Sequence, residues 1–115
     1  MINTLILSSP KDAHRALVIA SRTNANSPAE MMIAGAKAAM IVELKKRMQT
    51  SVVEFYFFKK NGQLRRAFGT TMSSLVEKHI NGNGISRDSV NTVAWFDVES
   101  GSWKSFRYES LVKVC

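Results

Sequence analysis

The chain has 115 residues, of which 45% are hydrophobic and 22% charged, a composition that excludes disorder and is typical of one small globular domain. Sixteen basic and nine acidic residues give a formal net charge of +7, which favours a polyanionic partner. Cys115 is the single cysteine, which excludes an internal disulfide, and Lys37 and Glu43 interrupt the most apolar stretch, 31–44, which excludes a bilayer span. We therefore expect a soluble cytoplasmic protein without membrane contact.

Two helices are predicted in residues 1–50. The first begins at Ser9-Pro10, because serine is a favoured N-cap and proline a favoured first helical residue. Its apolar residues at helical spacing are Ala13, Ala16, Leu17 and Ala20. After a break, Ser27-Pro28 begins the second helix by the same signal. The apolar stripe of this second helix consists of Ile33, Met40, Ile41, Leu44 and Met48.

Residues 51–115 change to β-branched and aromatic patterns, which favour strands. The five expected strands cover residues 52–58, 64–70, 90–98, 103–108 and 111–114. Asn61-Gly62 between the first two predicts a hairpin with a type I′ turn, and 72–80 fits either a short helix or an irregular segment. Because barrel closure removes exposed edges, five short strands in so few residues predict a compact β-barrel and an α+β fold class.

Two sequence blocks, 54–70 and 96–114, resemble a family of small SH3-like β-barrel proteins of uncharacterised function that are common on bacterial mobile elements and phages. The likeness runs from about Leu44 to the end, and that family also carries helices before its barrel. The resemblance implies that residues 1–50 are a helical extension and that 51–115 form a five-stranded SH3-like β-barrel. It also implies an origin on a phage or mobile element.

The second block is similar, more distantly, to the WYL domain of bacterial transcription regulators. That domain ends in an aspartate, a glycine turn, Arg-x-Phe-Arg and an apolar strand. Asp97 and residues 104–107 fit, with Lys104 in place of the first arginine. The signature Trp-Tyr-Leu would fall on residues 91–93, which are Asn-Thr-Val, and Ser110 stands where that family usually has a basic residue. This likeness therefore implies the fold and not the sensing of nucleic acid or small ligands.

Side chains suited to catalysis are sparse. The two histidines, His14 and His79, are far apart in sequence and have no cysteine or carboxylate at the spacing of a metal site or a triad. A catalytic pair can still assemble in space, but two solvent-facing histidines are the simpler interpretation. We expect the protein not to be an enzyme and to need no metal or cofactor.

Basic residues flank the predicted hairpin turn. Lys59, Lys60, Arg65 and Arg66 would converge there and could grip phosphates, with Tyr56 nearby to stack on a base. The alternative is that these charges only keep a strand edge soluble. In the fourth strand, the resembled families bury the residue at Phe106, which places Trp103 and Arg107 outside as a stacking and cationic surface. The alternative is that Trp103 covers the open end of the barrel or packs under the second helix.

The second helix offers a candidate partner interface, which comprises Met31, Met40, Leu44 and Met48. Methionines give an adaptable apolar surface that can dock a partner or a second copy, although such a stripe more often covers the domain's own core. Two functions follow. The first is a non-enzymatic protein that binds nucleic acid, DNA or RNA, through the hairpin with Trp103 and Arg107. The alternative is a protein-interaction module that inhibits or adapts a host protein machine.

Overall fold

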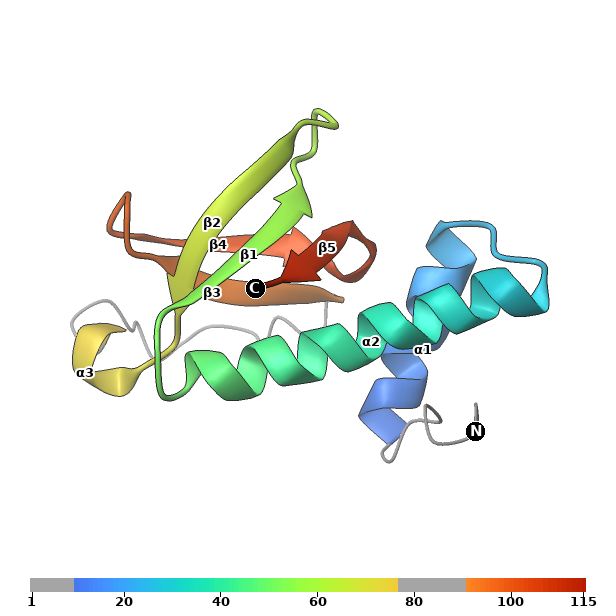
Figure 1. Ribbon diagram of the computed structural model, residues 1–115, viewed down its shortest axis with the longest axis horizontal. Coiled ribbons are helices and arrows are strands. Elements are labelled where there is room, and N and C mark those ends of the chain that lie inside the picture. Colours follow the sequence, from blue (N-terminus) through green and yellow to red (C-terminus); the bar gives the residue numbers. More distant parts are fainter. Residues whose placement is uncertain (1–9, 77–90) are drawn as a thin grey trace.

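The computed structural model describes residues 10–76 and 91–115 of the chain. Two long helices precede a five-stranded antiparallel sheet, so the predicted α+β fold is confirmed (Figure 1). The helices are α1 (Pro10–Arg22), α2 (Pro28–Met48), α3 (Ser73–Val76) and the short 3₁₀ helix η4 (Tyr108–Ser110). The strands are β1 (Val53–Phe58), β2 (Leu64–Thr70), β3 (Thr92–Asp97), β4 (Ser102–Arg107) and β5 (Leu111–Val114).

Local sequence signals set the ends of the long helices. Pro10 and Pro28 are the first residues of α1 and α2, as predicted. After α1, Asn24 has a φ of 55°, a left-handed conformation that asparagine tolerates at helix ends. The hydroxyl of Ser27 accepts a hydrogen bond from the N–H of Glu30 at 3.2 Å and donates one to the Glu30 carboxylate at 2.9 Å. This reciprocal pair caps the first turn of α2 and fixes where the helix begins.

The β1–β2 hairpin is present, but its turn differs from the predicted type I′. Gly62 has the expected positive φ of 85°, whereas Asn61 is not among the described residues with positive φ. The N–H of Gly62 donates to the carbonyl of Lys59 at 2.9 Å, and the N–H of Lys59 donates to the carbonyl of Gln63 at 2.8 Å. These bonds define a type I turn followed by a left-handed glycine, which makes the loop one residue longer than a type I′ connection.

The sheet has the strand order β4-β3-β2-β1-β5. Strands β4 and β5 lie at its two edges and do not pair with each other, so the sheet bends around the core without closing by hydrogen bonds. Pairing between β2 and β3 is limited to Gly69 with Asp97 and Thr70 with Phe96. The outer half of the β1–β2 hairpin therefore extends past β3, as the rising hairpin in Figure 1 shows.

Four aromatic rings fill the inner face of the sheet. The Phe55 ring meets Trp95 edge-on with centroids 5.0 Å apart, and the Phe57 ring stacks on Phe106 at 5.3 Å and 25°. All four are at most 6% exposed. They belong to the same hydrophobic cluster as the buried residues of α1 and α2. The barrel interior is therefore rigid and continuous with the helices.

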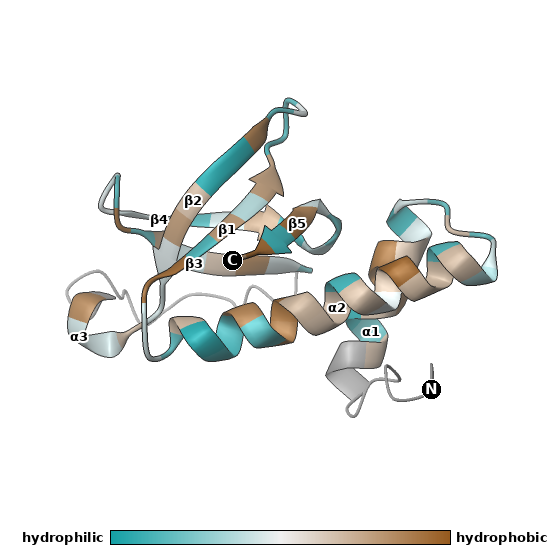
Figure 2. Ribbon diagram, viewed as in Figure 1, coloured by the Kyte–Doolittle hydropathy of each residue, from teal (hydrophilic) through white to brown (hydrophobic). Residues whose placement is uncertain are grey.

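Helix α2 covers this core through Ala34, Ala38, Ile41, Leu44 and Met48. Figure 2 shows apolar colours along most of α2 and hydrophilic turns near its C-terminal end. Leu44 and Met48 are fully buried and Met40 packs against the core, so these residues cannot line the expected partner interface in this structure. For these three residues the alternative interpretation holds, in which the stripe covers the domain's own core. Met31 is 44% exposed.

Helix α1 crosses α2 (Figure 1), and its predicted apolar face packs only in part: Ala16 and Ala20 contact the core, whereas Ala13 is exposed. Ile19 and Ala20 are buried, whereas Leu17 is 62% exposed. Because alanines lie at helical spacing on two faces of α1, the sequence pattern does not show which face packs against the core. The segment 72–80 contains α3, but residues 77–90, which include His79 and the predicted start of the third strand, lie outside the described residues. No helix in the described ranges is long and apolar enough to cross a bilayer.

A candidate nucleic-acid interface

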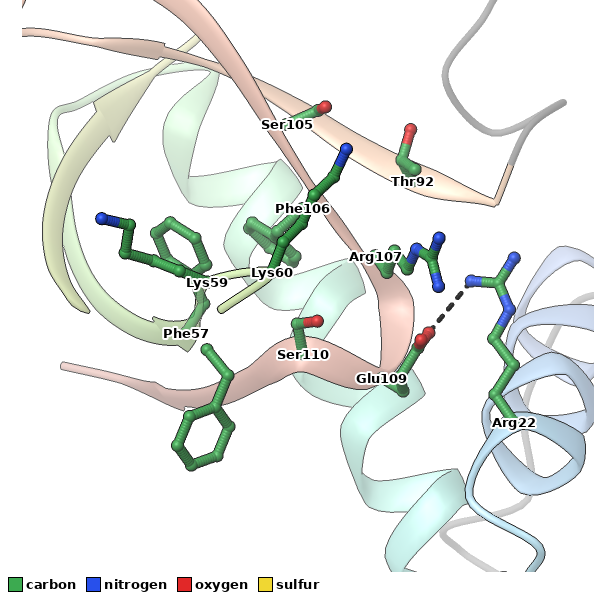
Figure 3. A pocket seen from close by; sticks show the side chains of 11 residues that line it. Arg22, Phe57, Lys59, Lys60, Thr92, Ser105, Phe106, Arg107, Glu109 and Ser110 are labelled. Atoms are coloured by element: carbon green, nitrogen blue, oxygen red, sulfur yellow. Dashed lines mark hydrogen bonds and ion pairs between the residues drawn. The ribbon is translucent and has the colours of Figure 1, made fainter. Parts of the chain in front are cut away.

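A cleft of about 590 Å³ opens between the end of β1, strand β4, η4 and helix α1 (Figure 3). Its lining is mostly basic, aromatic and hydroxyl side chains. The lining residues are Arg22, Phe57, Phe58, Lys59, Lys60, Thr92, Ser105, Phe106, Arg107, Glu109 and Ser110. The cleft lies where the two edge strands, β4 and β5, do not pair with each other.

A second hollow of about 380 Å³ adjoins the first on the other side of the hairpin lysines. The two share Phe57, Lys59, Lys60 and Ser105. The second hollow adds Asn61, Arg65 and Lys104. Because four residues belong to both linings, the two hollows are neighbours, and we call them together the basic cleft.

The cations of the basic cleft fall into two groups. Lys59, Lys60, Lys104 and Arg107 make no side-chain hydrogen bond or ion pair within residues 10–76 and 91–115. Arg22, by contrast, forms an ion pair with Glu109, its Nη1 lying 3.0 Å from the carboxylate. Lysine and arginine side chains without protein partners keep their donors available for an anionic ligand.

The floor of the basic cleft is apolar and fixed. Phe57 lines both hollows and Phe106 lines the larger one. Each of these rings is packed against the other and against the rest of the core, with at most 6% of its surface exposed. The basic side chains therefore surround a floor of closely packed aromatic rings.

Arg65 lies at the cleft but is engaged by a buried carboxylate. Its Nη2 is 2.6 Å from Oδ2 of Asp97, and its guanidinium lies over the ring of Trp95, 5.5 Å from the centroid. Burial opposes ionisation of Asp97, but hydrogen bonds from Arg65, from the Ser100 hydroxyl and from the N–H of Glu99 outweigh it and lower the pKa of Asp97 below its usual value. Arg65 therefore has a structural role as well as a place at the site.

Arg66 does not join this group, because successive strand residues point to opposite faces of a sheet. Its side chain lies on the outer face, where its Nε donates to the carboxylate of Glu54 and its guanidinium stacks over Phe68. The hydrogen bond with Glu54, and then the charge of Glu54, raise the pKa of Arg66. Of the four hairpin cations that the sequence predicts to converge, three line the cleft: Lys59, Lys60 and Arg65.

Trp103 and Arg107 are exposed on β4 while Phe106 is buried, as predicted. The Trp103 ring is 38% exposed and meets Phe96 edge-on at 5.9 Å on the outer face of the sheet. It neither lines the basic cleft nor belongs to the buried core. Arg107, at the end of β4, does line the cleft. The structure thus brings Arg107 to the hairpin lysines and separates Trp103 from them.

Two basic residues of the cleft were not among the predicted site residues. Lys104 lies two residues from Phe106 on the same strand, so strand alternation alone places it on the inner side. Arg22 belongs to α1, and only the packing of α1 against η4 brings it to the cleft. No pattern in the sequence predicts the packing of α1 against η4.

Catalytic geometry was also sought among the described residues. His14 Nε2 lies 3.0 Å from the side-chain oxygen of Asn91, a contact that needs no catalytic role. Within the described ranges, no group of three or more His, Cys, Asp and Glu side chains is placed to hold a metal ion. The absence of enzyme activity stays a prediction.

The helices and the open five-stranded sheet define a small SH3-like barrel protein. Residues 41–112 match the family WYL_2, described as an Sm-like SH3 β-barrel fold, and this match covers well over half of the chain. The chain belongs to the WYL_2 family, and the predicted resemblance to SH3-like and WYL-type domains is confirmed. No curated protein and no solved structure matches the chain.

Proposed function

We propose that this chain is a non-enzymatic protein that binds nucleic acid in the basic cleft. The observation that carries the proposal is the gathering of Lys59, Lys60 and Arg107 around one aromatic-floored cleft, without ion-pair partners among the described residues. The net charge of +7 supports it, because a basic domain attracts a polyanion before any contact forms.

The basic and the aromatic residues of the cleft have different roles in the proposed binding. The lysines and Arg107 neutralise phosphates and release counterions, which supplies affinity without reading sequence. The rings of Phe57 and Phe106 line the cleft but are at most 6% exposed, so they hold its shape while the cations make the contacts with the nucleic acid. Trp103 and Arg66, on the outer face, are not part of the surface that we propose.

The test compares two pairs of lysines. Lys59→Gln with Lys60→Gln removes two cations from the cleft, whereas Lys46→Gln with Lys113→Gln removes two exposed cations elsewhere. Binding of fluorescent single- and double-stranded DNA and RNA is measured by anisotropy over a salt series. The slope of log binding constant against log salt concentration is negative. We expect only the cleft variant to make it shallower, by about 1.4 to 1.8 for two lost phosphate contacts.

Equal effects of both lysine pairs would mean that binding follows total charge and not the cleft. Undetectable binding near physiological salt would overturn the proposal entirely. The comparison of DNA with RNA, and of single strands with duplexes, also identifies which nucleic acid the chain takes.

A second candidate function, a protein-interaction module, is favoured by the first turns of α2. Met31, Met32 and Ile33 are 44%, 41% and 58% exposed, an apolar group that water does not favour. Met31→Glu with Ile33→Glu should then abolish association, measured by analytical ultracentrifugation with and without host extract, and leave the fold intact. A variant that associates as the parent does would exclude this surface. The origin on a phage or mobile element stays a prediction.

A further inference from the structure

Arg22 occupies an unexpected position in the basic cleft. It is the last residue of α1 and precedes the segment 41–112 that matches the family, yet its side chain lines the same cleft as Lys60 and Arg107. Figure 3 shows its guanidinium reaching from α1 toward the guanidinium of Arg107. The cleft of this chain is therefore completed by a residue from outside the matched part of the barrel.

Arg22 uses only part of its hydrogen-bonding capacity. Its Nη1 donates to Oε1 of Glu109 at 3.0 Å and approaches the carbonyl oxygen of Asn91 at 3.4 Å. A guanidinium carries five N–H donors, and within the described part of the chain Nε and Nη2 of Arg22 make no hydrogen bond. With respect to the described residues, these donors are available to a ligand in the cleft that Arg22 lines.

Two guanidinium groups and one carboxylate leave an excess positive charge at the α1 end of the cleft. A phosphate group complements two arginines better than a single carboxylate does, because it accepts from both in bidentate geometry. The Arg22–Glu109 pair is partly open to solvent, since its side chains are 31% and 19% exposed, and solvent weakens the attraction between the two charges. Lys37 Nζ holds the backbone carbonyl of Glu109 at 2.9 Å, so the carboxylate can turn away while η4 stays in place.

We propose that Arg22 binds a phosphate group of the nucleic acid and that Glu109 competes with this phosphate for the Arg22 guanidinium. The inference rests on the proposed function, because it assigns a further phosphate-binding residue to the same cleft. Glu109 thereby sets how tightly the α1 end of the cleft holds its ligand.

The experiment is a double-mutant cycle on the full chain, with single-stranded oligothymidylate as the probe and anisotropy as the readout. Arg22→Gln should weaken binding roughly threefold to tenfold at low salt and reduce the salt slope by about 0.7, the value for one lost phosphate contact. Glu109→Gln should tighten binding by a similar factor. The double variant should bind like Arg22→Gln alone, because the carboxylate then has no guanidinium to compete for.

The Arg66–Glu54 ion pair on the outer face is a matched control, since Arg66→Gln and Glu54→Gln make the same charge changes away from the cleft. Arg22→Lys keeps the charge and should keep the salt slope, and thermal unfolding verifies that each variant is folded. If Glu109→Gln tightens binding equally with and without Arg22, the carboxylate acts by general repulsion and the inference is overturned.

The inference and the proposed function fail in different ways. Binding that depends on Lys59 and Lys60 but is unchanged by Arg22→Gln would overturn the inference alone. Binding that is indifferent to Lys59, Lys60 and Arg22 together would overturn both.

Discussion

Gly69 shows how one residue permits the packing beneath the cleft. It lies in β2, where the strand pairs with β3 opposite Asp97. A Cβ at this position would stand 2.8 Å from Cε3 of Trp95 and 2.9 Å from Cε1 of Phe55. Both rings are fully buried, so they cannot move aside without disturbing the aromatic cluster. The absence of a side chain is what allows β2 to approach the core this closely.

We predict that Gly69→Ala lowers the free energy of unfolding by about 1 to 3 kcal/mol, the usual range for overpacking a filled core. Gly35→Ala is the matched control, because a Cβ there meets nothing within 4 Å and the residue lies inside α2. That change should raise stability by about 0.5 to 1 kcal/mol, since alanine favours the helix. Urea denaturation measures both, and equal stability of the two variants would contradict the packing argument.

Asp97 is a second residue whose environment makes a measurable prediction. Its carboxylate is fully buried and accepts from Arg65 at 2.6 Å and from the Ser100 hydroxyl at 3.0 Å. The pKa of Asp97 is lower in the folded chain than in the unfolded chain. Its contribution to stability is therefore complete above the unfolded value of about 3.9 and declines as the pH falls through the lower folded value.

We expect Asp97→Asn to destabilise the chain at neutral pH by about 3 kcal/mol, because Arg65 then loses its charged partner. The same variant should lose less stability than the parent when the pH is lowered below about 4, since it has no carboxylate to protonate at this position. Chemical denaturation at a series of pH values gives both quantities. Parallel pH profiles for parent and variant would show that Asp97 does not carry this dependence.

At the level of elements, the sequence predicted most of what depends on neighbouring residues. The Ser27 cap, the period-two strands and the positive φ of Gly62 are local features, and each is present. The predicted convergence of the hairpin cations was wrong because Arg65 and Arg66 are successive residues of β2, and strand alternation places them on opposite faces of the sheet.

Contacts between distant segments could not be predicted. The cleft depends on the open sheet and on the crossing of α1, which bring Arg22 to η4 across most of the chain. In α2, likewise, the sequence does not show which apolar residues pack against the sheet, because all of them follow the same helical spacing. Packing alone decides that Leu44 is buried while Ile33 is exposed.

The junction of α2 with the barrel includes a buried hydroxyl, that of Thr70. Thr70, which is fully buried, donates from Oγ1 to the carbonyl of Met48 at 3.0 Å and lies equally close to the carbonyl of Ser51. The N–H of Thr71 also donates to the Met48 carbonyl, at 2.9 Å. These bonds satisfy a carbonyl in the last turn of α2 that has no partner within the helix.

Thr70→Val keeps the shape of the side chain and removes the hydroxyl. We predict a loss of about 1 to 3 kcal/mol in the free energy of unfolding, because a buried hydrogen bond to the Met48 carbonyl is lost and the N–H of Met72 loses its acceptor, the Thr70 hydroxyl. Thr50→Val is a suitable control, since its hydroxyl is exposed and lies 3.4 Å from its acceptor. Guanidinium denaturation distinguishes the two, and an unchanged Thr70→Val midpoint would show that the junction does not depend on this bond.

At the scale of the whole molecule, one hydrophobic cluster runs from the helices through the barrel. It includes Ile19 of α1, Ile41 and Leu44 of α2, and the rings of Phe55 and Trp95 in the sheet. The predicted division between a helical extension, 1–50, and a barrel, 51–115, is therefore a division of sequence within a shared core. The stability of the barrel without its helices then depends on how much free energy the buried side chains of α2 contribute.

A fragment of residues 51–115 keeps the four aromatic rings of the inner face but loses the cover of Ile41, Leu44 and Met48. Each such buried side chain contributes roughly 1.5 to 3 kcal/mol. We therefore expect the fragment to retain β-structure by far-ultraviolet circular dichroism and to unfold at lower urea than the full chain, with residues 28–115 between the two. A random-coil spectrum would mean that α2 is indispensable to the barrel. A fragment as stable as the full chain would mean that the helices contribute nothing to the core, against the burial of all three residues.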